Sequence, residues 1–323
     1  MTTASKHRLI LLVVALVACR SDSTSTDIQA SLRETDDPRR YSDWSAPINL
    51  GPPVNTAAGN FGSFISKDGL SLYFSCDLAC PDRIGGFDMF VSQRASLDEP
   101  WGPPQNLGPN INSTFDDNAP TITTDGHVML FTSNRPGFGG NDIWMSRRHD
   151  KRDDFGWEQP VNLGSPINTA GIDAGGVLFE DETGTVTLYF VSNRAGTLGA
   201  ADIYASTRQP DGTFGSPVPV AELNSPSSDQ QPAIRHDGLE FFLASDRPGT
   251  FGLVDLWVAT RASTSDPWGV PVNLGASVNS ASTDARPAVS FKGTELYFQS
   301  NRPGGFGAFD LYVITRSKLT GQD

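Results

Sequence analysis

The strongest constraint on the fold is a unit that recurs five times from Trp44 onward. One segment of this unit begins at positions that are 57, 56, 57 and 54 residues apart. Its five copies read WSAPINLG at 44–51, WGPPQNLG at 101–108, WEQPVNLG at 157–164, FGSPVPVA at 214–221 and WGVPVNLG at 268–275. Repetition at a fixed period is typical of an array of similar supersecondary units, so one local structure must serve all five copies.

Each unit contains four strand-like runs, which we label A to D. Run B follows an Asp-Gly type of turn, and its copies read KDGLSLYF at 67–74, TDGHVMLF at 124–131, DETGTVTLYF at 181–190, HDGLEFFL at 236–243 and FKGTELYF at 291–298. Run A precedes that turn, run C is of the Asp-Ile-Tyr type, and run D is the segment described above. Apolar residues at every second position, with Gly, Asn and Pro between the runs, predict β-strands throughout.

The order of the runs predicts how the array closes. A four-stranded sheet cannot bury both faces by itself, whereas sheets repeated around an axis bury one another. The chain starts with run D and ends with run C at Arg316, so the N-terminal run is expected to complete the last blade and remove a free sheet edge. We therefore predict an all-β fold over residues 44–323, a five-bladed β-propeller of four-stranded antiparallel blades. An open array or two separate domains are the alternatives.

The loop between runs B and C carries a further signature, SNRPGFGGNDIWMSRR at 133–148, with relatives at 192–208, 245–261 and 300–316. Together with the Asp-Gly turn, it resembles the WD-like repeat of the TolB-type propellers over about residues 44–316. The resemblance implies that the D–A and B–C loops share one face, here called the top face, where such propellers usually bind ligands. Relatives of this kind include periplasmic binding proteins, peptidase-attached propellers, peptidoglycan-associated lipoproteins and polysaccharide lyases, so the fold does not imply one function.

The N-terminus predicts export from a bacterial cell. A short basic segment ending at Arg8 precedes an apolar stretch over 9–17 that is too short to span a bilayer. The stretch ends in Leu-Val-Ala-Cys, which resembles the bacterial lipobox and implies lipidation of Cys19 and cleavage before it. An ordinary secretory signal with a chance cysteine is the alternative.

The same resemblance predicts where the protein resides. Arg20 stands where an aspartate would retain a lipoprotein at the inner membrane, which implies the outer membrane, on its periplasmic or surface side. We thus expect a lipoprotein signal peptide over 1–18 and a lipidated cysteine with a flexible tether, rich in Ser, Thr and Asp, over 19–43.

The charge balance limits the class of partner. The chain has a net charge of −13, and removal of residues 1–18 makes it −15. Phosphate backbones would repel such a surface, which argues against nucleic-acid binding. We expect a monomer that meets the membrane through its lipid anchor and binds an envelope protein or a polysaccharide.

One candidate site is a ring of residues at the start of each run A: Asn60, Asp117, Asp173, Asp229 and Asp284. Fivefold geometry would place them near the channel axis, and no regularly spaced Lys or Arg accompanies them. Oxygen ligands of this kind suit Ca²⁺, although no cofactor is required. The favoured alternative is structural, in which each side chain caps backbone N–H groups of its own loop.

A second repeated set pairs an arginine with an aspartate across the B–C hairpin. Its members are Arg135/Asp142, Arg194/Asp202, Arg247/Asp255 and Arg302/Asp310, and we interpret them as structural salt bridges. Blade one has Leu78 in place of the arginine. It has gained Cys76 and Cys80 in the same loop, and we predict a disulfide between them that replaces the missing clamp. A metal site is the alternative for these two thiols.

Residues that break the symmetry are better candidates for specificity. Gln230 and Gln231 in blade four and Arg286 in blade five have no equivalents in the other repeats. Aromatic residues of the B–C loops are further candidates, because they could stack on a sugar or an apolar side chain: Phe138, Phe251 and Phe306. Packing against the adjacent loop is the alternative for these rings.

The sequence disfavours several enzyme classes. Histidines after the signal peptide occur at positions 127, 149 and 236, all expected on the face opposite the candidate site. This disfavours a His-based lyase or a Ser/His/Asp hydrolase. We predict a non-catalytic envelope lipoprotein that binds a protein or glycan on its top face. The alternatives are a glycan-active enzyme, a glycosidase or lyase that uses top-face carboxylates, and a structural scaffold of an envelope complex.

Overall fold

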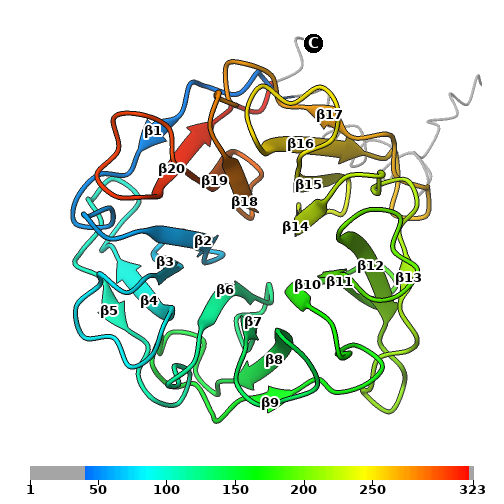
Figure 1. Cartoon of the computed structure of the whole chain (residues 1–323). Coiled ribbons are helices and arrows are strands. Elements are labelled where there is room, and N and C mark those ends of the chain that lie inside the picture. Colours follow the sequence, from blue (N-terminus) through cyan, green and yellow to red (C-terminus); the bar gives the residue numbers. More distant parts are fainter. Residues whose placement is uncertain (1–40, 320–323) are drawn as a thin grey trace, which may run out of the picture. The chain divides into compact units, whose positions relative to one another are not determined.

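Each repeat folds into one four-stranded antiparallel sheet, and five such sheets form a ring in the computed structural model, which describes residues 41–319 (Figure 1). The predicted five-bladed β-propeller is therefore confirmed. Blade one contains β2 (Asn60–Ile65), β3 (Ser71–Cys76), β4 (Asp88–Gln93) and β5 (Gln105–Asn106), and blade two contains β6 (Asp117–Ile122), β7 (Val128–Ser133), β8 (Asp142–Arg147) and β9 (Val161–Asn162). Blade three contains β10 (Asp173–Glu180), β11 (Val186–Ser192), β12 (Asp202–Thr207) and β13 (Val218–Pro219). Blade four contains β14 (Asp229–Ile234), β15 (Glu240–Ser245), β16 (Asp255–Thr260) and β17 (Val272–Asn273). Within residues 41–319 no helix is long and apolar enough to cross a membrane.

The fifth blade joins the two ends of the fold. It contains β18 (Asp284–Val289), β19 (Glu295–Ser300), β20 (Asp310–Thr315) and, as its outer strand, β1 (Ile48–Asn49). Ile48 pairs with Val313 and Asn49 with Tyr312 in antiparallel register. The expected closure by the N-terminal strand is thus present, and it removes the sheet edge that β20 would otherwise expose.

Tyr41, the first residue that the structure describes, is packed in the fold. Tyr41 forms an antiparallel bridge with Lys318, and the Arg316 guanidinium lies 3.9 Å from the centroid of its ring. Arg316 also lies 4.3 Å from the ring centroid of Trp44. Residues 41–43 were expected to belong to the tether, and the structure places them in the fold. The predicted signal peptide and the tether before residue 41 lie outside the described residues.

The hydrophobic core lies between neighbouring blades. The second strand of each blade is buried on both faces, as the pattern of β15 shows, where every residue is buried. Phe74 of blade one packs in one cluster with Tyr297 and Leu311 of blade five, and Phe242 of blade four packs with Leu296 and Phe298 of blade five. Burying such side chains contributes about 1.5–3 kcal/mol each, so packing between neighbouring blades contributes substantially to the stability of the ring.

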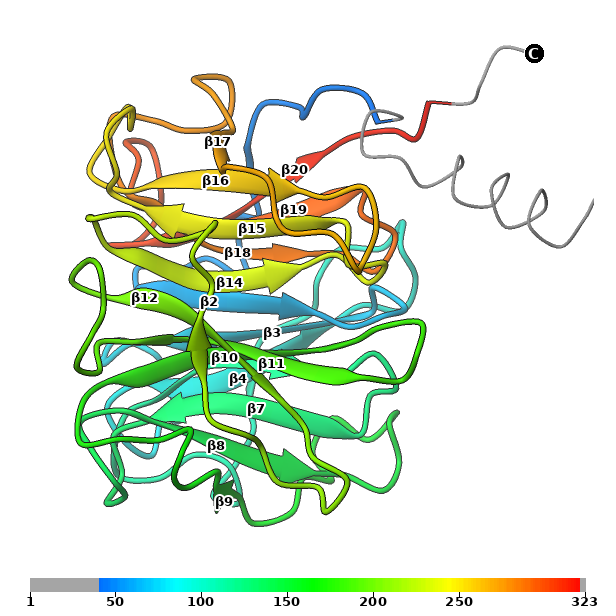
Figure 2. The same cartoon turned by 90° about the vertical axis from the view of Figure 1, so that its right-hand side faces the viewer.

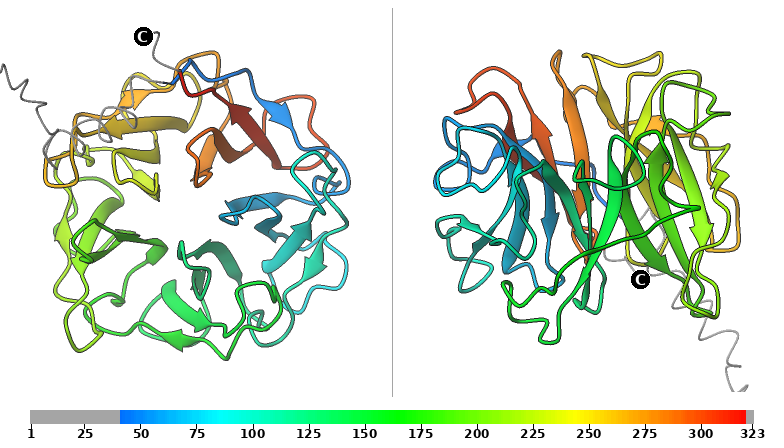
Figure 3. Two further views of the ribbon diagram at one scale, coloured as in Figure 1. Left: turned by 180° about the vertical axis from the view of Figure 1, so that it is seen from behind. Right: turned by 60° about the horizontal axis from the view of Figure 1, so that its bottom comes forward.

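The innermost strands β2, β6, β10, β14 and β18 surround the central axis (Figures 1 and 3). Figure 2 shows the ring from the side, where strands β14, β15 and β16 run across its thickness. Both ends of an inner strand therefore reach a face of the ring. The start of each inner strand meets the top face, which positions the residues described next.

Candidate functional site

The four aspartates of the predicted ring are fully buried, and they stabilise the loops of the top face. Asp117, Asp173, Asp229 and Asp284 each begin an inner strand and have no exposed surface. Asp117 Oδ2 accepts hydrogen bonds from Ser113 N at 2.6 Å and from Ser113 Oγ at 2.8 Å. The same pattern recurs at Asp284 with Ser280. Each carboxylate thus caps the loop that precedes its own strand.

An arginine from the B–C loop neutralises each of these carboxylates. Arg194 Nη2 lies 2.8 Å from Asp173 Oδ1, and Arg302 Nη2 lies 2.5 Å from Asp284 Oδ1. Equivalent pairs join Arg135 to Asp117 and Arg247 to Asp229. The expectation that no regularly spaced cation accompanies the ring is therefore wrong, because these arginines follow their partners by 18 or 21 residues.

The predicted salt bridges within the B–C hairpin are also wrong, because these arginines pair with the ring aspartates instead. The strand-C aspartates Asp142, Asp202, Asp255 and Asp310 do not pair with those arginines. Asp142 Oδ2 instead accepts hydrogen bonds from Phe138 N at 2.6 Å and from Asn162 Nδ2 at 2.8 Å. These neutral donors lie close in the loop and in strand D, so the arginine side chain turns inward to the charged partner at the start of strand A.

The ring does not form a metal centre. The four aspartates are absent from the residues that line the two cavities of the top face and channel, described below. Within the part of the chain that the structure describes, no group of three His, Cys, Asp or Glu residues is arranged to hold a metal ion. The carboxylate oxygens are already engaged by arginine and by backbone N–H groups, and such engagement stabilises the ring without a metal ion.

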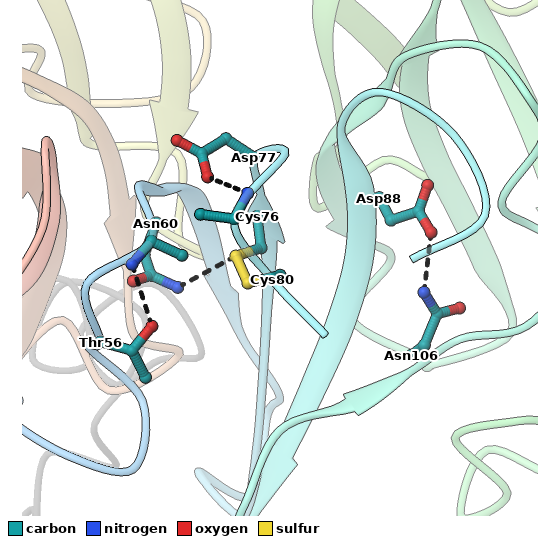
Figure 4. The surroundings of a disulfide bond; sticks show 9 residues. Thr56, Asn60, Cys76, Asp77, Cys80, Asp88 and Asn106 are labelled. Atoms are coloured by element: carbon teal, nitrogen blue, oxygen red, sulfur yellow. Dashed lines mark hydrogen bonds between the residues drawn. A yellow bond between two sulfur atoms is a disulfide. The ribbon is translucent and has the colours of Figure 1, made fainter. Parts of the chain in front are cut away.

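Blade one replaces the ion pair with a disulfide (Figure 4). Cys76 and Cys80 are bonded, with their Cα atoms 6.0 Å apart. Asn60, the blade-one member of the ring, donates from Nδ2 to Cys76 Sγ at 3.8 Å. Blade one has neither the ring aspartate nor the arginine that pairs with it in the other four blades. The disulfide therefore takes the place of that ion pair.

Two residues beyond the ring, each inner strand contains a bulge. The register shifts at the same point in all five blades, between Phe61 and Phe64 in blade one and between Ala285 and Ala288 in blade five. The equivalent residue of every blade has a positive φ: Gly62 (51°), Ala119 (55°), Gly175 (62°), Gln231 (59°) and Arg286 (54°). We call these five residues the bulge ring. They lie around a small cavity of ≈ 40 Å³ at the channel waist.

A larger cavity lies at the top mouth of the channel, between blades two, three and four. Its volume is ≈ 350 Å³, and we call it the mouth cavity. Its polar lining includes Asn118, Asn141, Asn193, Gln230, Gln231 and Arg286. The last three were predicted from the sequence, and the asparagines were not. Asn118 directly follows a ring aspartate, as Gln230 does, and that spacing could have revealed it.

Arg286 is the positively charged group of this cavity. Its backbone N donates to Gln231 Oε1 at 2.7 Å, and its Nη1 lies 3.5 Å from Asn118 Oδ1. Burial lowers the pKa of the guanidinium to about 10, so the group is still charged at neutral pH. No ion pair forms at Arg286 among residues 41–319.

Two carboxylates stand at the rim of the top face. The residue after strand B is an asparagine in three blades, and Asn193 Oδ1 accepts a hydrogen bond from Ile172 N at 2.7 Å. In blade four this residue is Asp246, an exposed side chain whose Oδ1 accepts from Ser228 N at 2.7 Å. In blade one it is Asp77, whose Oδ1 accepts from Ala79 N at 3.0 Å. Ser228 lines the mouth cavity, so Asp246 lies at its edge.

The three candidate phenylalanines do not converge on this cavity. Phe138, Phe251 and Phe306 are each 52% exposed and lie in three separate B–C loops. Their backbone N–H groups donate to the strand-C aspartates, which accounts for the loop conformation. None of the three belongs to the described lining of the mouth cavity.

Other hollows lie between blades and at the opposite end of the channel. A groove of ≈ 610 Å³ lies between blades two and three, lined by Asp125, Arg147 and Phe214 among others. Asp125 there accepts hydrogen bonds from Thr123 Oγ1 and His127 N, so it stabilises its own turn. A cavity of ≈ 380 Å³ that includes Lys67 and His236 lies at the opposite end of the channel.

Comparison with known proteins identifies structural neighbours only. The sequence matches no protein-family model and no curated protein. The α-L-arabinofuranosidase from Lactobacillus brevis superposes with a TM-score of 0.58 at 15% identity, over 82% of this chain and 92% of that one. The α-L-arabinofuranosidase from Podospora anserina superposes with a TM-score of 0.57 at 14% identity, over 86% and 98%. The endo-arabinase from Bacteroides thetaiotaomicron superposes with a TM-score of 0.55 at 18% identity, over 86% and 99%.

These neighbours correct our functional prediction. At such identities the likeness establishes the fold alone. Yet the neighbours are glycoside hydrolases, which contradicts our preference for a non-catalytic binding protein and favours the glycan-active alternative. The TolB-type resemblance stays a prediction.

Proposed function

We propose that this chain is a glycan-active enzyme that binds its substrate at the mouth cavity of the propeller. The observation that carries the proposal is a polar cavity at the channel mouth of a fold whose solved neighbours hydrolyse arabinose- or galactose-containing glycans. Amide side chains offer both donors and acceptors, which suits the hydroxyl groups of a sugar. Asn118, Asn193 and Gln230 supply such groups from three neighbouring blades.

Most glycosidases use two carboxyl groups to hydrolyse a glycosidic bond. One protonates the oxygen of the leaving group, and the other either activates a water molecule or attacks the sugar. The described lining of the mouth cavity contains no carboxylate, but Asp246 at its edge accepts a hydrogen bond from Ser228 N of that lining. We assign one of these roles to Asp246, an acidic residue at a position that is asparagine in three of the other four blades.

The proposed location follows from the N-terminal signals. We propose that the chain is exported, lipidated on Cys19 and anchored in a bacterial envelope, with an envelope polysaccharide as its partner. The segment that carries these signals lies outside the described residues. An anchored propeller would keep the enzyme close to a polymer that cannot enter the cell.

The direct test is hydrolysis of defined polysaccharides. Purified protein is incubated with arabinan, arabinoxylan, β-1,3-galactan and pectic polygalacturonan, and new reducing ends are measured. We expect cleavage of at least one polymer, and we expect Asp246→Asn to reduce the rate about 10²–10⁴-fold, the usual loss for an acid–base residue.

A matched variant separates this effect from the loss of any surface charge. Asp98 is an exposed aspartate in the loop between β4 and β5, away from the top face, and Asp98→Asn should leave the rate unchanged. Absence of cleavage on every polymer, or an equal rate in Asp246→Asn and wild type, would overturn the proposal.

A further inference from the structure

The bulge ring contains two long polar side chains where the backbone favours glycine. A non-glycine residue with φ near +55° is strained, typically by about 1–2 kcal/mol. Two blades relieve this strain with Gly62 and Gly175, and a third has a methyl group at Ala119. Blades four and five instead place Gln231 and Arg286 there. Because glycine would serve the fold better, the long polar side chains at these two positions point to a role other than folding.

Arg286 also differs from the other arginines of the top face. Arg135, Arg194, Arg247 and Arg302 each have a buried aspartate as an ion partner. Arg286 has no carboxylate partner among residues 41–319, and its nearest polar neighbours are the amides of Asn118 and Gln231. A partly buried cation without a counter-ion costs free energy unless an anion binds to it.

The position of the guanidinium indicates where that anion would lie. Arg286 lines both the waist cavity and the mouth cavity, so it forms the floor of the mouth. Nη1 lies 3.0 Å from the point where a Cβ on Gly62 of the neighbouring blade one would stand, and 3.5 Å from Asn118 Oδ1 of blade two, so the head of the side chain extends beyond its own blade into the channel. A ligand that enters from the top face therefore meets the amides first and the guanidinium last.

We propose that Arg286 is a specificity residue that binds the carboxylate of an acidic sugar, a uronate unit, at the floor of the mouth cavity. This inference rests on the proposed glycan activity and names its substrate class. The planar guanidinium matches a carboxylate through two parallel hydrogen bonds. The amides of Asn118, Gln230 and Gln231 remain for the sugar hydroxyls.

A single carboxylate fits the surroundings better than a phosphate. The described lining of the two cavities contains one cation and several neutral amides. The whole chain has a net charge of −13, which would repel a doubly charged phosphate more than a singly charged uronate. One positive charge is balanced by one carboxylate.

The test compares matched ligands on matched variants. Binding of D-galacturonate, D-galactose and inorganic phosphate is measured by ligand-observed NMR titration on the wild-type chain. The variant Arg286→Gly adopts the residue that blades one and three already have, so it should fold at least as well as the wild type. Ala119→Gly relieves strain at an equivalent position without removing a charge, and it is the control.

We expect the wild type to bind galacturonate at least tenfold more tightly than galactose, and Arg286→Gly to lose this preference, whereas Ala119→Gly retains it. Arg286→Lys should retain part of it, because lysine keeps the charge without the planar fork. Equal binding of galacturonate and galactose, an unchanged preference in Arg286→Gly, or tighter binding of phosphate than galacturonate would overturn the inference.

The outcome is separable from that of the proposed function. An Arg286-dependent preference for galacturonate without cleavage of any polymer would sustain the acidic-sugar site and reject the enzyme. Cleavage of neutral arabinan with no galacturonate preference would sustain the enzyme and reject the site.

Discussion

Arg302 Nη2 lies 2.5 Å from Asp284 Oδ1, and this ion pair joins the loop after β19 to the first residue of β18. Asp284 has no exposed surface, and its second oxygen is held by Ser280. Arg302 also donates to the carbonyl oxygen of Val278 at 2.8 Å. The Arg302 side chain therefore links strand A, the loop before it and the loop after strand B of the same blade.

The first prediction concerns this buried pair. Arg302→Met should lower the free energy of unfolding by about 3–5 kcal/mol, because it leaves Asp284 buried without a partner. The exposed pair of Arg152 with Asp150, 3.7 Å apart, is the control. Arg152→Met should change stability by less than about 1 kcal/mol. Urea denaturation measures both, and equal losses would contradict the assigned role of the buried pair.

The second prediction concerns closure of the ring. Deletion of residues 41–51 should lower the melting temperature strongly, because blade five loses β1 and the contacts of Tyr41 and Trp44 with Arg316. Deletion of residues 20–40 should leave the melting temperature within about a degree of the parent, since that segment contains little to bury. Thermal unfolding followed by circular dichroism decides the matter. Identical melting of the two truncated forms would refute closure by the N-terminal strand.

The third prediction concerns the disulfide of blade one. The bridge spans four positions, and closing so short a loop restricts few unfolded conformations. Replacing both Cys76 and Cys80 with serine should therefore lower the free energy of unfolding by about 2 kcal/mol or less. Titration of the denatured, unreduced protein should detect neither thiol, and two reactive thiols from this loop would show that the bond is absent.

The fourth prediction concerns the anchor. Cys19→Ser should abolish labelling by a palmitate analogue and move the protein from the membrane fraction to the soluble fraction, since two or more acyl chains are needed for stable anchoring. Fractionation of cells that express the wild type or the variant measures this. A variant that stays with the membrane would show that another segment binds there.

Sequence alone predicted the architecture because the signals are local and repeated. Period-two runs between turn residues identified the strands, and the five copies identified the blades. The order of runs, from D at Trp44 to C at Arg316, was enough to expect β1 beside β20. The spacing of Cys76 and Cys80 in one short loop likewise needed no tertiary information.

Local sequence signals could not predict which aspartate each arginine pairs with. Arg135 has Asp142 seven residues after it and Asp117 eighteen residues before it. The nearer one was chosen, and it was wrong. Asp142 is satisfied by neutral donors of its own loop and of strand D, and only the folded hairpin shows that the arginine reaches strand A.

The chain by itself determined how many blades form, where they begin and how the ring closes, because each depends on hydrophobic periodicity and turn residues within one repeat. Only the tertiary structure brought Asn118, Gln231 and Arg286 together around one channel. These residues lie on three blades, with 55 positions between Gln231 and Arg286 and 168 between Asn118 and Arg286, and each reaches the channel because its strand starts at the axis. A bulge with positive φ then turns Gln231 and Arg286 toward a cavity that no single repeat contains.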